Sequence, residues 1–360
     1  MFHKITVLVT GVGGGGNGEQ ILKALRMAEN KYEIIGCDIS QYSKGLKCVD
    51  IPYVVPRAND PTYLEVLLEI CRKHDVKVLF PGSEPELLFL SRNREKVFEE
   101  KIFLLVNPEP VIETCMNKSK TFEFFEKNNF LFPKTKLLRT LNDAGDWNIF
   151  PAILKPSIGS GGSAHIYITQ NQDELTMLSK YMLEGNICPE IVIQEYVGTP
   201  DSEYTVGVLF DMDGNFINSI AVKRDLGSAL SRRISVPNRT GAREFTPYLV
   251  VSSGISQGEI GQFPEVTAQC EKIGRQLGAR GPINVQCRIH KGDVYVFEIN
   301  PRFSGTTSLR AMVGYNEPDL LIRKHLLGED IQPRFKYKSG IIMRGLDETF
   351  FDTNEKICLA

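Results

Sequence analysis

The sequence predicts an α/β fold in its first part and an α+β fold in its second part. Over roughly residues 1–108, short apolar strand patterns alternate with helical patterns, which is typical of a parallel sheet covered by helices. Later strand patterns follow one another through short turns, as at 211–215 and 291–293, and such hairpins favour antiparallel sheets. A chain of 360 residues is long for one domain, so we expect two or three subdomains.

The composition is that of an ordinary globular protein, with 42% hydrophobic and 24% charged residues. The formal net charge of −2 gives no basic surface for nucleic acid, and no apolar run is long enough to span a membrane. The N-terminus lacks the pattern of a signal peptide, and the eight cysteines are scattered without a C-x-x-C pair. We therefore expect a cytoplasmic protein with reduced thiols. The five histidines show no ligand spacing, so no zinc site is expected.

The expected elements follow from the periodicity of the apolar residues. In the first part we expect strands at 4–10, 34–38, 76–82 and 102–107, and a helix at about 18–29. In the second part we expect helices at about 117–129, 172–184 and 264–278, and strands at 152–156, 165–169, 191–197, 204–211, 216–222, 283–289 and 294–300. Residues 224–262 are polar and rich in glycine and serine, so we expect long loops there.

A glycine-rich segment, 11–18, lies between the first strand and the first helix. Small residues at this position let backbone N–H groups approach a phosphate. Asp38, at the end of the next strand, lies where an acid binds the ribose of a dinucleotide. These features are compatible with an NAD-dependent oxidoreductase. The same glycines also allow close packing of helix against sheet, so both interpretations stay open at this point.

Lys155 ends a predicted strand and is followed at once by a loop of glycines and hydroxyl residues. A lysine suits phosphate oxygens, and such a loop can cover them with backbone N–H groups. The spacing does not match a P-loop. The candidate phosphate-binding residues are Lys155, Ser157, Gly159, Ser160, Gly161 and Gly162. Lys118, at the start of a predicted helix, is a further candidate, although a lysine there is usually solvated.

The segment Gln194-Glu195-Tyr196-Val197 ends another predicted strand. Its backbone N–H and C=O groups and its carboxylate can bind the edge of an adenine ring, and Glu203 can reach ribose hydroxyls. Taken alone, the segment is equally compatible with an ordinary exit from a strand into a loop.

The strand predicted at 294–300 places several polar side chains in one small region. Because side chains alternate along a strand, Glu298, Asn300 and, if the extended form continues, Arg302 point to the same side. Pairing across the preceding turn brings Gln286 toward Glu298. Glu, Asn and Gln supply the oxygen ligands that Mg²⁺ prefers, and Arg suits a phosphate. On alternation alone, a solvated polar face is an equally good interpretation.

Two further groups of charged residues can contact a substrate. Cations crowd the segment 222–243, which is either a solvated face or a site for an acidic substrate or for phosphates. The five candidates there are Lys223, Arg224, Arg232, Arg233 and Arg239. Glu84 and Glu86 follow the strand predicted at 76–82, at a carboxyl end where ligands bind to α/β layers. They can hold an amine or simply stabilise a helix N-terminus.

The order of these motifs resembles that of the ATP-grasp superfamily, with the nearest likeness to the synthetase halves of the carbamoyl phosphate synthase large subunit and their stand-alone relatives. The motifs are KPSIGSGG at 155–162, GPINVQ at 281–286 and FEINPRFSGTT at 297–307. The resemblance covers roughly residues 1–330. It implies a Rossmann-like pre-ATP-grasp parallel sheet followed by an ATP-grasp fold with two antiparallel-sheet subdomains. The implied domains are a pre-ATP-grasp domain at 1–108, a small lid subdomain at 109–190, a C-terminal subdomain at 191–330 and an extension at 331–360.

The resemblance also implies a role for each candidate residue. Lys118 and Lys155 contact the phosphates of ATP under a lid at 157–163. Glu195 and Val197, within the segment from Gln194, hold adenine, and Glu203 holds the ribose. Gln286, Glu298 and Asn300 bind two Mg²⁺ ions, with Mn²⁺ as a possible substitute, and Arg302 steadies an acyl phosphate. In this family the glycine-rich N-terminal layer helps to hold substrate and does not bind NAD.

The mechanism implied is a two-step ligation that releases ADP. A carboxylate attacks the γ-phosphate, and a nucleophile, usually an amine, then displaces phosphate from the acyl phosphate. The carbamoyl phosphate enzymes carry a histidine where this chain has Gly254-Ile-Ser256, and often an arginine where it has Lys155. We therefore expect a stand-alone ligase for a small carboxylate and a small amine, with a homodimer as a possible assembly. The alternatives are an NAD-dependent oxidoreductase, a carbamoyl-phosphate-synthase-like activity and a nucleotide-binding protein without turnover.

Overall fold

The computed structural model describes residues 4–157 and 165–348. The predicted lid residues Gly159, Ser160, Gly161 and Gly162 lie outside these residues. In the two described stretches, no helix combines the length and the apolar character needed to cross a membrane.

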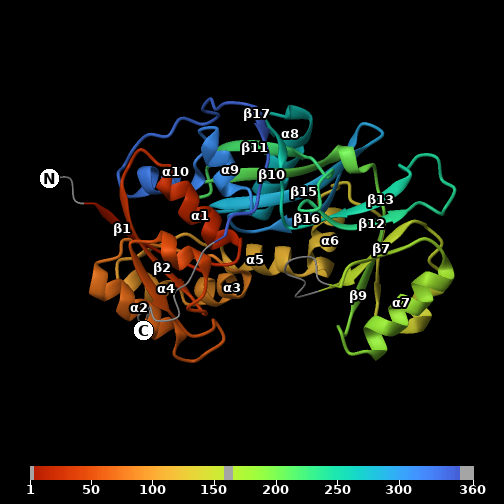
Figure 1. Ribbon diagram of the computed structural model, residues 1–360, viewed down its shortest axis with the longest axis horizontal. Helices are drawn as coiled ribbons and strands as arrows, with labels where there is room; N and C mark the ends of the chain where they lie inside the picture. Colours follow the sequence, from red (N-terminus) through yellow and green to blue (C-terminus); the bar gives the residue numbers. More distant parts are fainter. Residues whose placement is uncertain (1–3, 158–164, 349–360) are drawn as a thin grey trace.

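The N-terminal layer is a parallel sheet with strand order β3-β2-β1-β4-β5 (Figure 1, red to orange). The strands are β1 (Ile5–Thr10), β2 (Tyr32–Asp38), β3 (Ile51–Val54), β4 (Val78–Phe80) and β5 (Phe103–Leu104). Its helices are α1 (Asn17–Arg26), α2 (Tyr63–His74), α3 (Glu84–Arg92) and α4 (Arg94–Glu99). The predicted parallel layer is confirmed. β3 adds to the four predicted strands, because it is short and contains a proline, and its apolar alternation is therefore weak.

Two helices, α5 (Glu109–Met116) and α6 (Lys118–Lys127), lead from this layer into the second part of the chain (Figure 1). There, an antiparallel sheet has the strand order β6-β9-β7-β8. Its strands are β6 (Thr135–Leu138), β7 (Ala152–Pro156), β8 (Tyr167–Thr169) and β9 (Ile191–Glu195). The helix α7 (Gln172–Glu184) packs on it through Leu175 and Met182, which are fully buried with Leu154.

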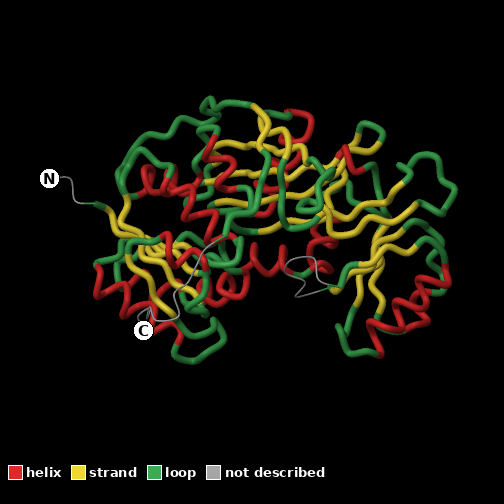
Figure 2. The backbone as a smooth tube through the Cα atoms, viewed as in Figure 1, coloured by secondary structure: helices red, strands yellow, loops and turns green. Residues whose placement is uncertain are grey.

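A six-stranded antiparallel sheet has the strand order β16-β15-β10-β11-β14-β17. Its strands are β10 (Glu203–Phe210), β11 (Phe216–Arg224), β14 (Gly258–Gly261), β15 (Pro282–His290), β16 (Asp293–Asn300) and β17 (Gly340–Ile342). The helix α8 (Pro264–Leu277) buries Val266 and Ile273 against apolar residues of β10 and β15, such as Val206 and Val285. Figure 2 shows that the strands of the second part form a band between the N-terminal layer and α7. The antiparallel second part is confirmed.

The long loops predicted for 224–262 are a wrong prediction. Besides β14, this segment contains β12 (Arg232–Pro237) and β13 (Tyr248–Ser252), which pair as a two-stranded antiparallel sheet. Most of β12 is exposed or only half-buried, so its sequence carries polar residues on both faces and shows no apolar alternation. β14 has the sequence GEIG, and its two glycines weaken the strand pattern, so the sequence does not indicate a strand there.

A buried polar cluster links the six-stranded sheet to the helices that follow it. Arg310, on α9 (Thr307–Met312), is fully buried and donates to Glu317, the first residue of α10 (Glu317–His325), at 3.0 Å. Its other terminal nitrogen donates to Asn284 Oδ1 on β15 at 2.7 Å. Gly207 on β10 makes room for it, because a Cβ there would lie 2.3 Å from the guanidinium. These contacts therefore hold β15, which carries the metal-ligand candidate Gln286, in a fixed position.

Candidate active site

A cavity of about 840 Å³ lies among the N-terminal layer, the four-stranded sheet and the six-stranded sheet. This volume is in the range of small-molecule sites. Residues far apart in the sequence meet in its wall, and they include Glu84, Lys118, Lys155, Gln194, Glu195, Tyr196, Val197, Glu203, Gln286, Glu298, Asn300 and Arg302. Ser157, the one residue of the predicted lid at 157–163 that the structure describes, is not part of this wall.

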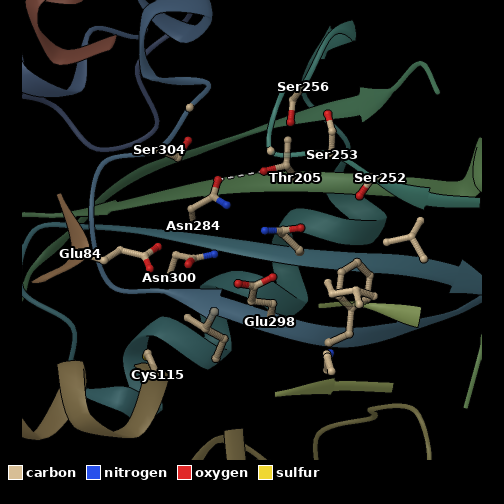
Figure 3. Close-up of a pocket in the computed structure, with 18 of the residues that line it drawn as sticks. Glu84, Cys115, Thr205, Ser252, Ser253, Ser256, Asn284, Glu298, Asn300 and Ser304 are labelled. Atoms are coloured by element: carbon tan, nitrogen blue, oxygen red, sulfur yellow. Dashed lines mark hydrogen bonds between the residues drawn. The ribbon is translucent and has the colours of Figure 1, made fainter. Parts of the chain in front are cut away.

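Strand register brings the metal-ligand candidates together. Gln286 on β15 pairs with Glu298 on β16, and Asn284 pairs with Asn300 in the same way. Residues two apart on a strand share a face, so all four side chains project from one face of the sheet. The cavity wall contains all four. Figure 3 shows Asn284, Glu298 and Asn300 around one small region.

The oxygen-rich group Gln286, Glu298 and Asn300 fits a magnesium site. Carboxylate and amide oxygens are ligands that Mg²⁺ prefers. Asn300 is 7% exposed, and its amide nitrogen Nδ2 has no hydrogen-bond partner in the described part of the chain. A buried amide without a partner is costly, which marks this position as one built to interact with a group that enters the cavity. Asn300 Oδ1 accepts a hydrogen bond from Arg302 at 3.2 Å.

Two lysines line the same cavity as this metal-ligand group. Lys155 is the penultimate residue of β7 and is almost fully buried. Its ammonium donates to Gln194 Oε1 at 2.9 Å. Burial and, to a lesser extent, the nearby Lys118 lower the pKa of Lys155, Glu298 opposes them, and the net result is a pKa of about 7. Lys118 begins α6, where Asn117 caps the helix through its side chain. A second cation close to Lys155 is costly unless anions such as phosphates join them.

The segment Gln194 to Val197 forms one edge of the cavity, as predicted for an adenine site. The Tyr196 hydroxyl donates to Val250 O at 3.1 Å and accepts from Val250 N at 2.9 Å. These bonds tie the end of β9 to β13. The Glu195 carboxylate accepts from the backbone of Lys134 at 3.2 Å. The side chains of this segment are thus fixed in place.

Glu203 lies in a buried ionic cluster. Its Oε1 accepts from Arg224 Nη1 at 3.0 Å, and its Oε2 accepts from Arg288 Nε at 3.0 Å. The Glu203 and Arg224 side chains are each 2% exposed, so the carboxylate offsets one of the two guanidinium charges away from water and the cluster keeps a net charge of +1. Both carboxylate oxygens already have strong donors, and a ribose hydroxyl would have to share them.

The structure distinguishes the remaining predicted residues that line the cavity from those with a structural role. Of the five candidate cations at 222–243, only Arg224 lies in the cavity wall, and it is paired with Glu203. Glu86 is buried, closes a capping box with Ser83 and accepts from the Tyr63 hydroxyl, so its role is structural. Asp38 accepts from the backbone of Gly13 at 2.9 Å and of Ile39 at 2.8 Å, which holds the glycine loop. This disfavours Asp38 as a ribose ligand.

Asn284 and Arg288 are among the residues of the cavity wall that were not predicted as site residues. Asn284 and Arg288 flank Gln286 at alternate positions of β15, and both line the cavity. The alternation that singled out Asn300 next to Glu298 applies equally to them. The signal was present in the sequence.

Family models match both ends of the chain. Residues 7–105 match the model of the PylC-like N-terminal domain, and residues 250–349 match that of the ATP-grasp in the biosynthetic pathway with Ter operon. The carbamoyl phosphate synthase large chain of Caldanaerobacter subterraneus subsp. tengcongensis is 25% identical over 257 residues, which are 69% of this chain. This chain spans 22% of that protein's length.

Solved structures share the fold. The ADP complex of N5-carboxyaminoimidazole ribonucleotide synthetase aligns with a TM-score of 0.64 and 16% identity, over 93% of this chain and 80% of that one. The D-alanine–D-alanine ligase of Bacillus anthracis, complexed with ATP, aligns with a TM-score of 0.54 and 16% identity, over 90% of this chain and 97% of that one. Together with the matched family models and the site described above, these likenesses confirm the resemblance drawn from the motifs. The chain is similar to ATP-grasp proteins in sequence and in fold, and its residues 250–349 match an ATP-grasp family model.

Proposed function

We propose that this protein is an ATP- and Mg²⁺-dependent ligase that joins a small carboxylate to an amine and releases ADP and phosphate. The observation that carries the proposal is the pairing of Gln286 with Glu298 and of Asn284 with Asn300 in the wall of a cavity that Lys118 and Lys155 also line. This oxygen-rich group, the metal face, together with two lysines suits a nucleoside triphosphate and its metal. Relatives with ligase names and bound ADP or ATP support the same assignment.

We assign each group of cavity residues to one part of the bound nucleotide or to its metal. Gln194 to Val197 hold the base, and Lys118 and Lys155 hold the phosphates. Gln286, Glu298 and Asn300 hold Mg²⁺, which when bound neutralises charge on the transferring phosphoryl group. We assign no ion count to this face.

In the first chemical step two anions, the substrate carboxylate and the γ-phosphate of ATP, must approach each other. The substrate carboxylate attacks the γ-phosphate, the bond to ADP breaks, and an acyl phosphate results. Lys155 is charged when phosphates surround it, because an anion favours its protonated form. Arg302, held at 2.7 Å from Glu84 and 3.2 Å from Asn300, lies beside the metal face and can steady the acyl phosphate. These cations lower the barrier by opposing the negative charge that accumulates.

The second step is the displacement of phosphate by the amine nitrogen. No side-chain nucleophile is needed, because the acyl phosphate is itself the activated group. A cavity with largely buried walls excludes water, which would otherwise hydrolyse that intermediate.

The test is an ADP-release screen of the purified protein with Mg-ATP, amino acids and other small carboxylates, each with and without an added amine. We expect ADP and phosphate in equal amounts, and only when both substrates are present. Release of AMP and pyrophosphate would refute the acyl-phosphate route. A result in which NAD, but not Mg-ATP, raises the melting temperature would favour the oxidoreductase alternative instead.

A further inference from the structure

Glu84 is the acidic side chain that the N-terminal layer contributes to the cavity. It is the first residue of α3, in the turn that follows β4. Its side chain is 34% exposed, and Figure 3 shows it extending toward Asn300. Its neighbour in sequence, Glu86, is buried and committed to the helix cap. The two acids that look alike in the sequence therefore differ in role, and only Glu84 reaches the site.

One oxygen of the Glu84 carboxylate is occupied and the other is not. Oε1 accepts from Arg302 Nη2 at 2.7 Å, and the same nitrogen donates to Asn300 Oδ1 at 3.2 Å. Within residues 4–157 and 165–348, no donor is found for Oε2. A carboxylate has about four acceptor positions, so Glu84 can bind a second cation while it holds Arg302. The Arg302 guanidinium would then lie between that cation and Asn300 of the metal face.

The surroundings of Glu84 carry little positive charge. The N-terminal layer contributes Gly14, Gly15 and Gly16 to the same cavity wall, and the segment after Arg302 contributes the hydroxyl residues Ser304 and Thr306. The other cations of the described wall are assigned to the phosphate and ribose regions, and they are Lys118, Lys155, Arg224 and Arg288. A phosphorylated or strongly acidic molecule would find only Arg302 here, which already faces a carboxylate. A small protonated amine matches the charge and the hydroxyls.

We propose that Glu84 binds the amine substrate and selects a small cationic amine without phosphate. This inference depends on the proposed ligase function and assigns the residue that recognises its second substrate. Through Oε2 the carboxylate holds the protonated amine beside Arg302, which steadies the acyl phosphate, and accepts one proton from the amine. The neutral nitrogen then forms the C–N bond as the C–O bond to phosphate breaks, and the departing phosphate takes the second proton from the nitrogen. Holding the nitrogen near the acyl carbon replaces an encounter in solution by an oriented one.

A simpler explanation is that Glu84 only orients Arg302. The two explanations differ in which half of the reaction they affect. If Glu84 only orients Arg302, loss of its charge slows formation of the acyl phosphate. If Glu84 binds the amine, acyl phosphate still forms, and only its capture by a cationic amine is impaired. Hydroxylamine separates the two, because it is an uncharged nucleophile at neutral pH and needs no carboxylate to bind it.

The chain offers a matched control for the substitution. Glu109 is the first residue of α5 and is followed by a proline, as Glu84 is in α3. Its carboxylate binds an arginine, Arg92, at 2.6 Å, and its side chain is 39% exposed. It does not line the cavity. E84Q and E109Q therefore make the same chemical change in the same local structure, inside and outside the site.

The experiment compares wild type, E84Q and E109Q with Mg-ATP and a mixture of amino acids. One arm adds hydroxylamine and measures hydroxamate, and the other relies on the amines of the amino acids and measures amide product by mass spectrometry. For E84Q we expect hydroxamate within about twofold of wild type, but amide formation slower by about tenfold or more, with a raised KM for the amine. E109Q should match wild type in both arms.

Three outcomes would overturn the assignment. Equal losses in both arms would show that Glu84 acts only through Arg302. An unchanged rate of amide formation would show that it does not touch the amine. If wild type forms neither hydroxamate nor amide from any carboxylate in the mixture, the proposed function itself is refuted, and the role of Glu84 falls with it.

Discussion

The buried ammonium of Lys155 makes a quantitative prediction about proton uptake. Burial, aided by Lys118, lowers the pKa of Lys155 to about 7, against the effect of Glu298. At pH 8 such a group is only about one-tenth protonated in the free protein. Phosphates beside it favour the charged form, so its pKa rises toward the ordinary value near 10.5 in the complex. Binding of Mg-ATP should therefore take up about 0.9 proton at pH 8 and only about 0.1 at pH 6.

The sign for affinity follows from the same linkage. Because the complex binds more protons than the free protein, affinity is greatest below pH 7 and falls by up to about tenfold for each pH unit above it. Isothermal titration calorimetry in two buffers of different ionisation enthalpy measures the uptake directly. Lys155→Met removes the group and should abolish the uptake. No uptake at pH 8 in wild type, or equal uptake in the Met variant, would refute the assignment of Lys155 to the phosphates.

Two further predictions concern the metal face and the buried ions. Glu298→Ala should abolish ADP release and the stabilisation by Mg-ATP in a thermal-shift assay, with an unchanged melting temperature of the free protein. Asp293→Ala, at the exposed start of the same strand, is the control and should behave as wild type. Glu203→Ala should cost about 3–5 kcal/mol in urea unfolding, because it leaves Arg224 and Arg288 buried without a counter-ion. Burial would raise the pKa of Glu203, but Arg288 and Arg224 outweigh it and lower that pKa, so its stabilisation is present above pH 4.5 and is lost as the pH falls through the lowered value. A Glu203→Ala variant as stable as wild type would show that the cluster contributes nothing net.

Local patterns account for only part of the metal-ligand group. Glu298 and Asn300 share a face by strand alternation. The tight turn between β15 and β16 pairs Cys287 with Val296 and, continued without a break, would place Phe297 opposite Gln286. A register shift between Gln286 and Cys287 brings Glu298 there instead, and the strand pattern alone does not indicate this shift. The parallel N-terminal layer was predictable from the sequence, because its strands and helices have distinct periods.

Contacts across the chain were beyond the reach of such rules. The Glu84–Arg302 pair joins residues 218 positions apart, and Glu203 meets its two arginines only after β10, β11 and β15 align. The spacing Ser83-x-x-Glu86 before an apolar run is that of a capping box, a sequence signal for Glu86 as the structural acid that was not used. The contact of Tyr63 with Glu86, which no local pattern indicates, fixes that role in the structure. β12 was missed because an exposed strand lacks the apolar alternation by which strands are recognised.

The central claim is that a substrate carboxylate attacks the γ-phosphate of ATP. It is tested most directly by transfer of oxygen from the substrate. Once the ADP-release screen has identified a carboxylate, that compound is labelled with oxygen-18 in its carboxyl group, and the phosphate formed is analysed by mass spectrometry. The acyl-phosphate route predicts one labelled oxygen in each inorganic phosphate and none in ADP. Unlabelled phosphate, or label in AMP, would contradict it.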